Sequence, residues 1–211
     1  MNDHKYISQI MNDHKYISQI ITIQKCVRAY LKNLIIPSHC QTKEWRKTRT
    51  WYKGGKSNEC EKYQINLIEK MLAIKLMKTQ NRINMENYEI TTNTHPMKNS
   101  DGFEWTENFD GLLIKNTSKY YFNLKFVCDK GGAQTRSLRE VYHFIRCEME
   151  YLIKYDTKNT YFINILDGDE CFRAMDQFLY LFNKEKYKQV IKYVFIGSLY
   201  DFKKKMKLLI V

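Results

Sequence analysis

The sequence predicts a mixed α/β domain, in which a mixed β-sheet is flanked by helices and preceded by a helical extension at the N-terminus. Two observations support this fold class. Hydrophobic residues make up 44% of the 211 residues, with only 2 Pro and 8 Gly, which is the composition of a packed globular chain. Segments with helical spacing of apolar residues also alternate with short apolar runs that are typical of strands.

The N-terminal region differs from the rest of the chain. Residues 1–20 consist of the decapeptide MNDHKYISQI written twice, and two such short copies are too few for a repeat architecture. Apolar residues at helical spacing predict a helix over about residues 21–36, which Pro37 ends. We therefore assign residues 1–45 to the duplicated decapeptide and a basic helical extension, and residues 46–211 to the α/β domain.

One segment of this extension, residues 23–32 (IQKCVRAYLK), resembles half of an IQ motif, the target helix of calmodulin-type proteins. Ala29 and Asn33 replace the glycine and the last basic residue of that motif. An ordinary basic amphipathic helix is the simpler interpretation. A calmodulin-like partner is therefore not expected.

A basic, aromatic-rich connector and a long helix precede the predicted sheet. Residues 41–58 are dense in Lys, Arg and Trp, so they either lie along phosphates or form a solvated boundary of the domain. Apolar residues at helical spacing predict a largely buried helix over about residues 59–82. Residues 83–100 are predicted to be mostly loop, with a short strand near residues 88–92.

A β-hairpin follows, with strands over residues 109–115 and 119–128 joined by a tight turn at residues 116–118. The remaining predicted elements are a helix over about residues 137–154, a strand over 161–166, a helix over 170–182 and a strand over 190–196. This order implies a mixed sheet in which the hairpin forms the antiparallel part.

Charge and cysteine usage narrow the class of protein. The chain has 35 Lys+Arg against 23 Asp+Glu, and the net charge of +12 favours a polyanionic partner such as nucleic acid. Its 6 cysteines lack metal-ligand spacing, which predicts reduced thiols without zinc. No apolar run approaches the ~20 residues of a membrane span. We expect a cytoplasmic protein, and the composition rich in Lys, Asn, Ile and Tyr is typical of an AT-rich bacterium or a large DNA virus in its host cell.

Polar side chains interrupt the second strand of the hairpin. Alternation along this strand places apolar side chains on one face, and Asn123 and Lys125 together on the other. An ammonium group in an apolar strand must be paired or solvated. Asp110 lies across the hairpin from Lys125, so a carboxylate and an ammonium can converge on one opening at the edge of the sheet.

Two further acidic positions are candidates for this opening. Glu140, in the predicted first turn of the next helix, can point toward the opening or cap its own helix through the capping box Ser137-x-x-Glu140, and the sequence leaves both open. The group Asp167-Gly-Asp-Glu170 could bind a metal, but a helix N-terminus attracts carboxylates without one. Capping is the favoured interpretation for this second group.

The arrangement of Asp110, then Asn123-Leu-Lys125 on the next strand, then a helix resembles the core of the PD-(D/E)xK nuclease superfamily. Over roughly residues 60–202 the chain is similar to a type II restriction endonuclease. The resemblance implies a restriction-endonuclease-like core and a hydrolase that cuts phosphodiester bonds of double-stranded DNA at a specific sequence, with Mg²⁺ as cofactor. It also implies a homodimer, because cleavage of both strands is symmetric.

The resemblance departs from the family at Asn123, where other members carry a carboxylate. Some members move this carboxylate onto the following helix, a position that Glu140 matches, and Glu61 and Glu69 are lesser candidates. If no residue replaces the carboxylate, the chain is instead a catalytically inactive DNA-binding protein of the PD-(D/E)xK fold.

The resemblance implies roles for each residue of the site. Asp110 and Glu140, with the main-chain carbonyl next to Asn123, would hold Mg²⁺. Lys125 would orient or deprotonate the attacking water and stabilise the charge on the phosphorane. The candidate DNA contacts are Gln134, Arg136 and Arg139, because Arg binds phosphate or guanine and Gln can pair with adenine. A solvated start of the helix is the alternative interpretation of these three residues.

Overall fold

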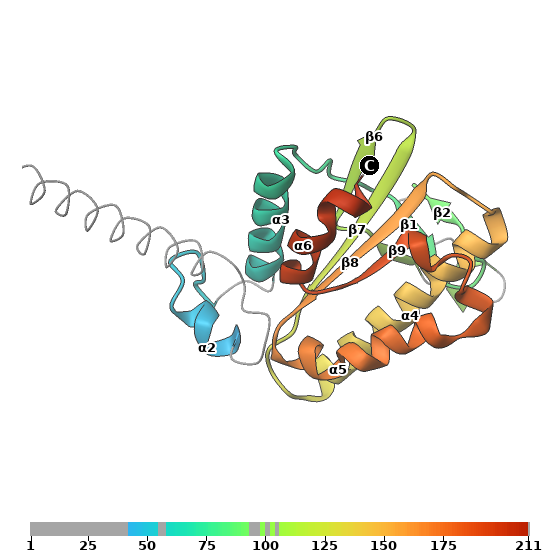
Figure 1. Ribbon diagram of the computed structural model, residues 1–211. Helices are drawn as coiled ribbons and strands as arrows, with labels where there is room; N and C mark the ends of the chain where they lie inside the picture. Colours follow the sequence, from blue (N-terminus) through green and yellow to red (C-terminus); the bar gives the residue numbers. More distant parts are fainter. Residues whose placement is uncertain (1–41, 55–57, 93–97, 100–101, 104–105, 211) are drawn as a thin grey trace, which may run out of the picture. The chain divides into compact units, whose positions relative to one another are not determined.

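The computed structural model describes residues 42–54, 58–92, 98–99, 102–103 and 106–210 (Figure 1). All of them belong to one compact unit that comprises Pro37–Val211. The predictions for the duplicated decapeptide and for the IQ-like segment lie outside the described residues.

Four strands form the central sheet, in the order β6 (Gly111–Lys115), β7 (Ser118–Phe126), β8 (Thr160–Asp167) and β9 (Val194–Gly197). The β6–β7 pair is an antiparallel hairpin, while β7, β8 and β9 run parallel to one another. The predicted mixed sheet with an antiparallel hairpin is therefore confirmed.

Helices cover both faces of this sheet, as a mixed α/β fold requires (Figure 1). On one face lie α3 (Glu59–Leu72) and α6 (Leu199–Leu209), and on the other lie α4 (Gly132–Tyr155) and α5 (Asp169–Leu179). Because α4 and α5 connect the parallel strands, the chain passes across one face of the sheet twice before α6 returns to the opposite face.

Strand β7 is buried on both of its faces. Phe122 is completely buried and meets Phe202 of α6 edge-on, with ring centroids 6.1 Å apart. On the opposite face, Tyr121 stacks on Phe162 of β8 at 5.8 Å. The predicted alternation of side chains is confirmed, but the face that carries the two polar residues is also part of the core. A polar group on that face therefore needs a partner inside the protein.

Several predicted helix boundaries are wrong. Helix α3 ends at Leu72, where Ala73 adopts a left-handed conformation, and Met77 then bridges to Leu112 beside β6. Helix α4 begins at Gly132, earlier than predicted, because the glycine pair that suggested a loop lies at the start of the helix.

The C-terminal part of the chain also differs from the prediction. Helix α5 ends at Leu179 and continues as the 3₁₀ helix Tyr180–Asn183, and further 3₁₀ turns delay the start of β9. Helix α6 was not predicted. Its start carries a capping box, in which the Ser198 side chain accepts from the Asp201 N–H and the Asp201 side chain accepts from the Ser198 N–H.

Two small sheets lie outside the main one. They consist of the antiparallel sheet formed by β2 (Ile90–Thr91), β1 (Arg82–Asn84) and β5 (Thr106–Asn108), and of the antiparallel pair β3 (Lys98–Asn99) and β4 (Gly102–Phe103). Of these strands only β2 was predicted. Strand β5 leads directly into the hairpin, so the three-stranded sheet positions the residues just before Asp110.

The described part of the basic connector is attached to the domain. It forms α2 (Thr42–Lys47), whose first backbone N–H groups, those of Thr42 and Lys43, both donate to the Asp169 carboxylate at 3.0 Å. Lys43 and Arg46 also pair with Asp129. The predicted domain boundary at residue 46 stays a prediction.

Two further expectations concern the chemistry of the described chain. Its cysteines, at positions 60, 128, 147 and 171, are all buried free thiols, as predicted. Among the helices that the structure describes, none has the length and apolar character needed to cross a membrane.

Candidate active site

The hairpin fixes Asp110 beside the middle of β7. The backbone N–H of Asp110 donates to the Phe122 carbonyl at 2.8 Å, and its Oδ2 accepts from the Leu124 N–H at 2.7 Å. Lys125, the next residue of β7, is half-buried. Burial raises the pKa of the Asp110 carboxyl, and the Leu124 N–H and the Lys125 charge offset part of that rise. The structure thus brings this carboxylate and this ammonium together.

Glutamates of three other elements lie near Lys125: two interact with its charge, and the third lines a small cavity with it. Glu61 lies in the first turn of α3, Glu107 on β5, and Glu140 on the exposed side of α4. Burial raises the pKa of Glu61 and of Glu107, the Lys125 charge lowers both, and the negative charge of Asp110 raises both. Glu140 raises the pKa of Glu107 as well. The charge of Lys125 therefore acts on three carboxyl groups, those of Asp110, Glu61 and Glu107.

Lys125 lines two cavities. The larger, of about 330 Å³, is lined by Glu61, Arg46 and Gln134 together with Lys125. The smaller, of about 30 Å³, is lined by the two glutamates of β5 and α4 together with Asn123 and Lys125. The larger cavity has room for a substrate group, while the smaller is about the size of one water molecule or ion.

Asn123 is held by a chain of buried amides. Its side chain is 2% exposed, and its Nδ2 donates to Oδ1 of Asn164, the residue opposite it on β8, at 2.7 Å. Nδ2 of Asn164 donates in turn to Oε2 of Glu148 on α4, at 2.6 Å. Glu148 is completely buried, and this burial raises the pKa of its carboxyl to about 8.

The capping-box interpretation of Glu140 is wrong. Because α4 begins at Gly132, both Ser137 and Glu140 lie beyond its first turn, where no free backbone N–H remains to be capped. The interpretation that is left open places Glu140 at the opening beside Lys125, which the smaller cavity fits.

Glu69 does not lie in the site. Its Oε1 accepts from the Leu76 N–H at 3.0 Å, so it stabilises the chain reversal after α3. Of the two lesser candidates, only Glu61 lies near Lys125.

The acidic group after β8 connects elements of the fold. Asp167 is completely buried, accepts from Gln64 at 2.7 Å and from the Leu199 N–H at 3.2 Å, and has its pKa raised by burial to about 7. Asp169 and Glu170 lie in the first turn of α5, but no side chain caps this helix. The Asp169 carboxylate instead accepts from the first N–H groups of α2, so it satisfies the start of a neighbouring helix and not of its own.

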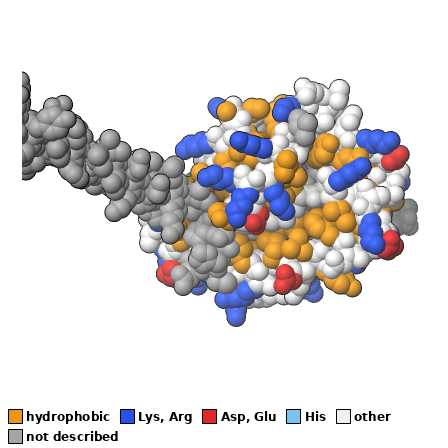
Figure 2. All heavy atoms as spheres, in the orientation of Figure 1, with side chains coloured by type: hydrophobic (Ala, Val, Ile, Leu, Met, Phe, Trp, Pro, Cys, Tyr) orange, Lys and Arg blue, Asp and Glu red, His pale blue; other side chains and the backbone are white. Residues whose placement is uncertain are grey.

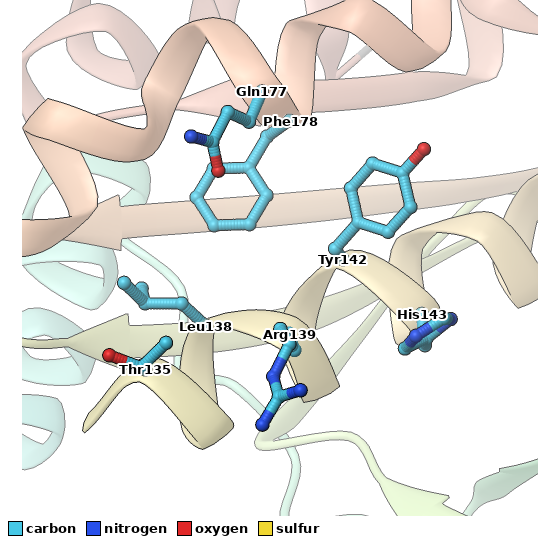
Figure 3. Close-up of a pocket in the computed structure, with 7 residues that line it drawn as sticks. All are labelled: Thr135, Leu138, Arg139, Tyr142, His143, Gln177 and Phe178. Carbon is cyan, nitrogen blue, oxygen red and sulfur yellow. The ribbon is translucent and has the colours of Figure 1, made fainter. Parts of the chain in front are cut away.

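The three candidate DNA contacts lie along the first turns of α4, but they face different spaces. Gln134 lines the cavity beside Lys125, and Arg136 is exposed. Arg139 borders a separate groove of about 310 Å³ between α4 and α5, where the rings of Tyr142 and Phe178 line the space and Arg139 points away from α5 (Figure 3). Only Gln134 therefore lies at the proposed opening.

Sequence reasoning did not identify Glu107 as a member of the site. It stands three positions before Asp110, but nothing in the local sequence pattern separates it from the other glutamates. Its position depends on the pairing of β5 with β1, in which Glu107 lies opposite Ile83, and β1 was not predicted.

The donor chemistry of the site suits a hard divalent cation, because carboxylate oxygens are the ligands that Mg²⁺ prefers. The negative charges of Glu140 and Asp110 raise the pKa of Glu107, and a cation would relieve this repulsion. Within the described chain, however, no three His, Cys, Asp or Glu side chains are already gathered to hold a metal ion.

No protein-family model, no curated protein and no solved structure matches the chain.

Proposed function

We propose that the chain is a Mg²⁺-dependent endonuclease of the PD-(D/E)xK superfamily, of the type II restriction kind, that hydrolyses phosphodiester bonds at a specific sequence of double-stranded DNA. One observation carries this proposal: the hairpin holds the Asp110 carboxylate near Lys125, where the charges of both act on Glu61 and Glu107. The mixed sheet with its antiparallel hairpin supports a restriction-endonuclease-like core.

Asp110 and Glu140 would hold the Mg²⁺ ion, with Glu107 as an additional oxygen donor beside them. When bound, such an ion polarises the phosphate and makes water a better nucleophile. Lys125 supplies a positive charge that is half-buried among carboxylates, where it orients the attacking water and stabilises the negative charge that develops on the phosphorane.

The surface charge supports a DNA substrate. The chain carries a net charge of +12, and on the face shown in Figure 2 Lys and Arg side chains are more numerous than Asp and Glu side chains. Gln134, Arg136 and Arg139 are the proposed contacts to phosphates or bases. We further propose that the active form is a homodimer in the cytoplasm of a bacterium or of a virus-infected cell.

A catalytically inactive DNA-binding protein is the second candidate, and Asn123 favours it. This residue stands where a nuclease of the family carries a carboxylate, and its amide nitrogen is bound to Asn164. Loss of a charged ligand would weaken metal binding but leave the basic surface intact.

Cleavage and binding of DNA are measured separately to decide between the two candidates. The purified chain is incubated with supercoiled plasmid in Mg²⁺, Mn²⁺ or EDTA, beside the variants Lys125→Ala, Glu140→Ala and Glu107→Gln. Lys119→Ala, an exposed lysine on the same strand, is the matched control. The nuclease proposal expects discrete fragments that require the metal and Lys125 but not Lys119. Salt-sensitive DNA binding without cleavage in any metal would support the inactive protein instead.

A further inference from the structure

We propose that Glu148 and Asn164 are positioning residues that fix the direction of the Asn123 carboxamide, so that its oxygen rather than its NH₂ group faces the cavity beside Lys125. The use of that oxygen as a ligand rests on the proposed function. The direction of the carboxamide rests only on the buried contacts between β7, β8 and α4.

The three side chains form a continuous hydrogen-bonded chain inside the protein. Asn123 and Asn164 lie opposite each other on neighbouring parallel strands, so their amides are held side by side by the register of the sheet. Asn164 and Glu148 are both 0% exposed, and the two hydrogen bonds measure 2.7 Å and 2.6 Å. Water does not compete for these groups, so each amide is held in one orientation by its neighbour.

The direction of these hydrogen bonds is set at the buried end of the row, by Glu148. Above the pKa of about 8 that burial gives it, the Glu148 carboxylate can only accept hydrogen bonds, so Asn164 then turns its NH₂ group toward Glu148, as it does in the structure. The oxygen of Asn164 then faces Asn123 and accepts from its NH₂ group. The oxygen of Asn123 is the end that is left for the cavity that Asn123 lines together with Lys125 and Glu140.

Glu148 is difficult to explain as a purely stabilising residue. Its Oε1 is buried and has no hydrogen-bond partner in the part of the chain that the structure describes. Burying a carboxyl with one oxygen unsatisfied is costly, and an apolar side chain would fill the same space with less loss of free energy. Its one satisfied oxygen sets the orientation of Asn164, which fits a role in positioning.

The oxygen of Asn123 would give the site a neutral, hard ligand next to the carboxylates. Amide oxygens coordinate Mg²⁺ and Ca²⁺ in proteins, whereas an NH₂ group cannot. The two hydrogen bonds thus let Asn123 contribute a ligand oxygen from the position at which nucleases of the PD-(D/E)xK superfamily carry a carboxylate.

Substitutions that reverse the donors and acceptors of the two hydrogen bonds test their direction. Asn123→Asp replaces the NH₂ group by a second acceptor, so two oxygens face each other unless Asn164 rotates, and rotation then turns the oxygen of Asn164 toward the Glu148 carboxylate. Adding Glu148→Gln supplies a donor at the buried end and allows the whole chain to run in the opposite direction. The thermal unfolding midpoint of the full chain is measured for both single variants and the double variant, above the pKa of Glu148.

We expect Asn123→Asp to lower the midpoint of the wild-type chain by about 5 °C or more, and to lower that of the Glu148→Gln chain by less than half as much. The control is Asn123→Asp combined with Glu150→Gln, because Glu150 lies on the same helix but binds Lys186 and Tyr187 instead. In the Glu150→Gln chain the loss should be undiminished. Additive effects in the Glu148 double variant, or an equally diminished loss with Glu150→Gln, would overturn the proposed direction.

Mg²⁺ alone serves as the second probe, through the shift that it causes in the same unfolding midpoint. When the hydrogen bonds are reversed, the double variant presents a carboxylate at position 123 in place of an amide oxygen. The Mg²⁺ concentration for half-maximal stabilisation should therefore be roughly tenfold lower for the double variant than for Glu148→Gln. A diminished loss of the midpoint without any response to Mg²⁺ would uphold the positioning chain and count against the proposed nuclease function. Response to Mg²⁺ without a diminished loss would do the reverse.

Discussion

Replacing Glu148 by glutamine should change how the stability of the protein depends on pH. In the folded chain, burial raises the pKa of the Glu148 carboxyl to about 8, from an ordinary value of 4.5. Between pH 4.5 and about pH 8, the folded state therefore binds more protons at Glu148 than the unfolded state does. The free energy of unfolding therefore falls as pH rises through this interval.

The magnitude follows from the two pKa values. Each pH unit that separates the folded from the unfolded pKa corresponds to about 1.4 kcal/mol, so this carboxyl removes at most about 5 kcal/mol of stability between pH 4.5 and pH 8. Glutamine has a similar shape, can keep the hydrogen bond from Asn164, and carries no charge. Glu148→Gln should consequently match the wild-type chain at low pH and exceed it in stability above pH 8.

Urea denaturation followed by tryptophan fluorescence at a series of pH values measures this difference. Asp167 contributes a similar slope in both proteins, because burial raises its pKa to about 7, so only the difference between the two curves reports on Glu148. Glu150→Gln is the control. Burial alone would raise the pKa of Glu150, but its contacts with Lys186 and Tyr187 outweigh this and lower it, so removing the Glu150 charge should reduce stability at neutral pH. Parallel curves for Glu148→Gln and the wild-type chain would refute the reasoning.

Two further predictions concern packing. Gly168→Ala should lower the free energy of unfolding by about 3 kcal/mol or more, because Gly168 has φ +102° and a Cβ there would lie 2.3 Å from the Val127 carbonyl oxygen. Gly132→Ala is the control and should be nearly neutral, because its Cβ would meet no atom within 4 Å. Similar urea midpoints for the two variants would contradict this prediction. Phe202→Ala should lower the free energy of unfolding by about 3–5 kcal/mol, because Phe202 is 0% exposed. Leu208 is 82% exposed, so Leu208→Ala should change the free energy of unfolding by no more than about 0.5 kcal/mol. A Phe202→Ala chain as stable as the wild type would show that α6 does not pack as described.

The sheet could be predicted because its signals are local. An apolar run between turn residues defined β8, and the short turn at Asn116 joined the two strands of the hairpin, so β6, β7 and β8 were each identified close to their observed ranges. Helix α6 was missed because the lysines from Lys203 to Lys205 dilute its apolar spacing. The Ser198-x-x-Asp201 pattern before it was a capping signal that could have identified its start.

The clearest local signals for the site lie on the hairpin. Asp110 precedes β6 and Lys125 lies on the paired strand β7, so the predicted hairpin is enough to bring the two charges near each other. Glu107 reaches the site through β1 and β5, two short strands without a periodic signal. Glu148 lies on the buried side of a helix between apolar residues, and only the tertiary structure shows that it contacts Asn164. Long-range contacts of this kind leave no local pattern in one sequence.

The central claim, that this chain is a metal-dependent nuclease, is tested most directly by single-turnover cleavage of supercoiled plasmid in Mg²⁺ by the wild-type chain and by Lys125→Ala. We predict that the wild-type chain linearises the plasmid into discrete products, that EDTA abolishes the reaction, and that Lys125→Ala slows it by at least about a hundredfold while DNA binding is retained. Equal cleavage by the wild-type chain and Lys125→Ala, or intact plasmid in every metal despite tight binding, would contradict the claim.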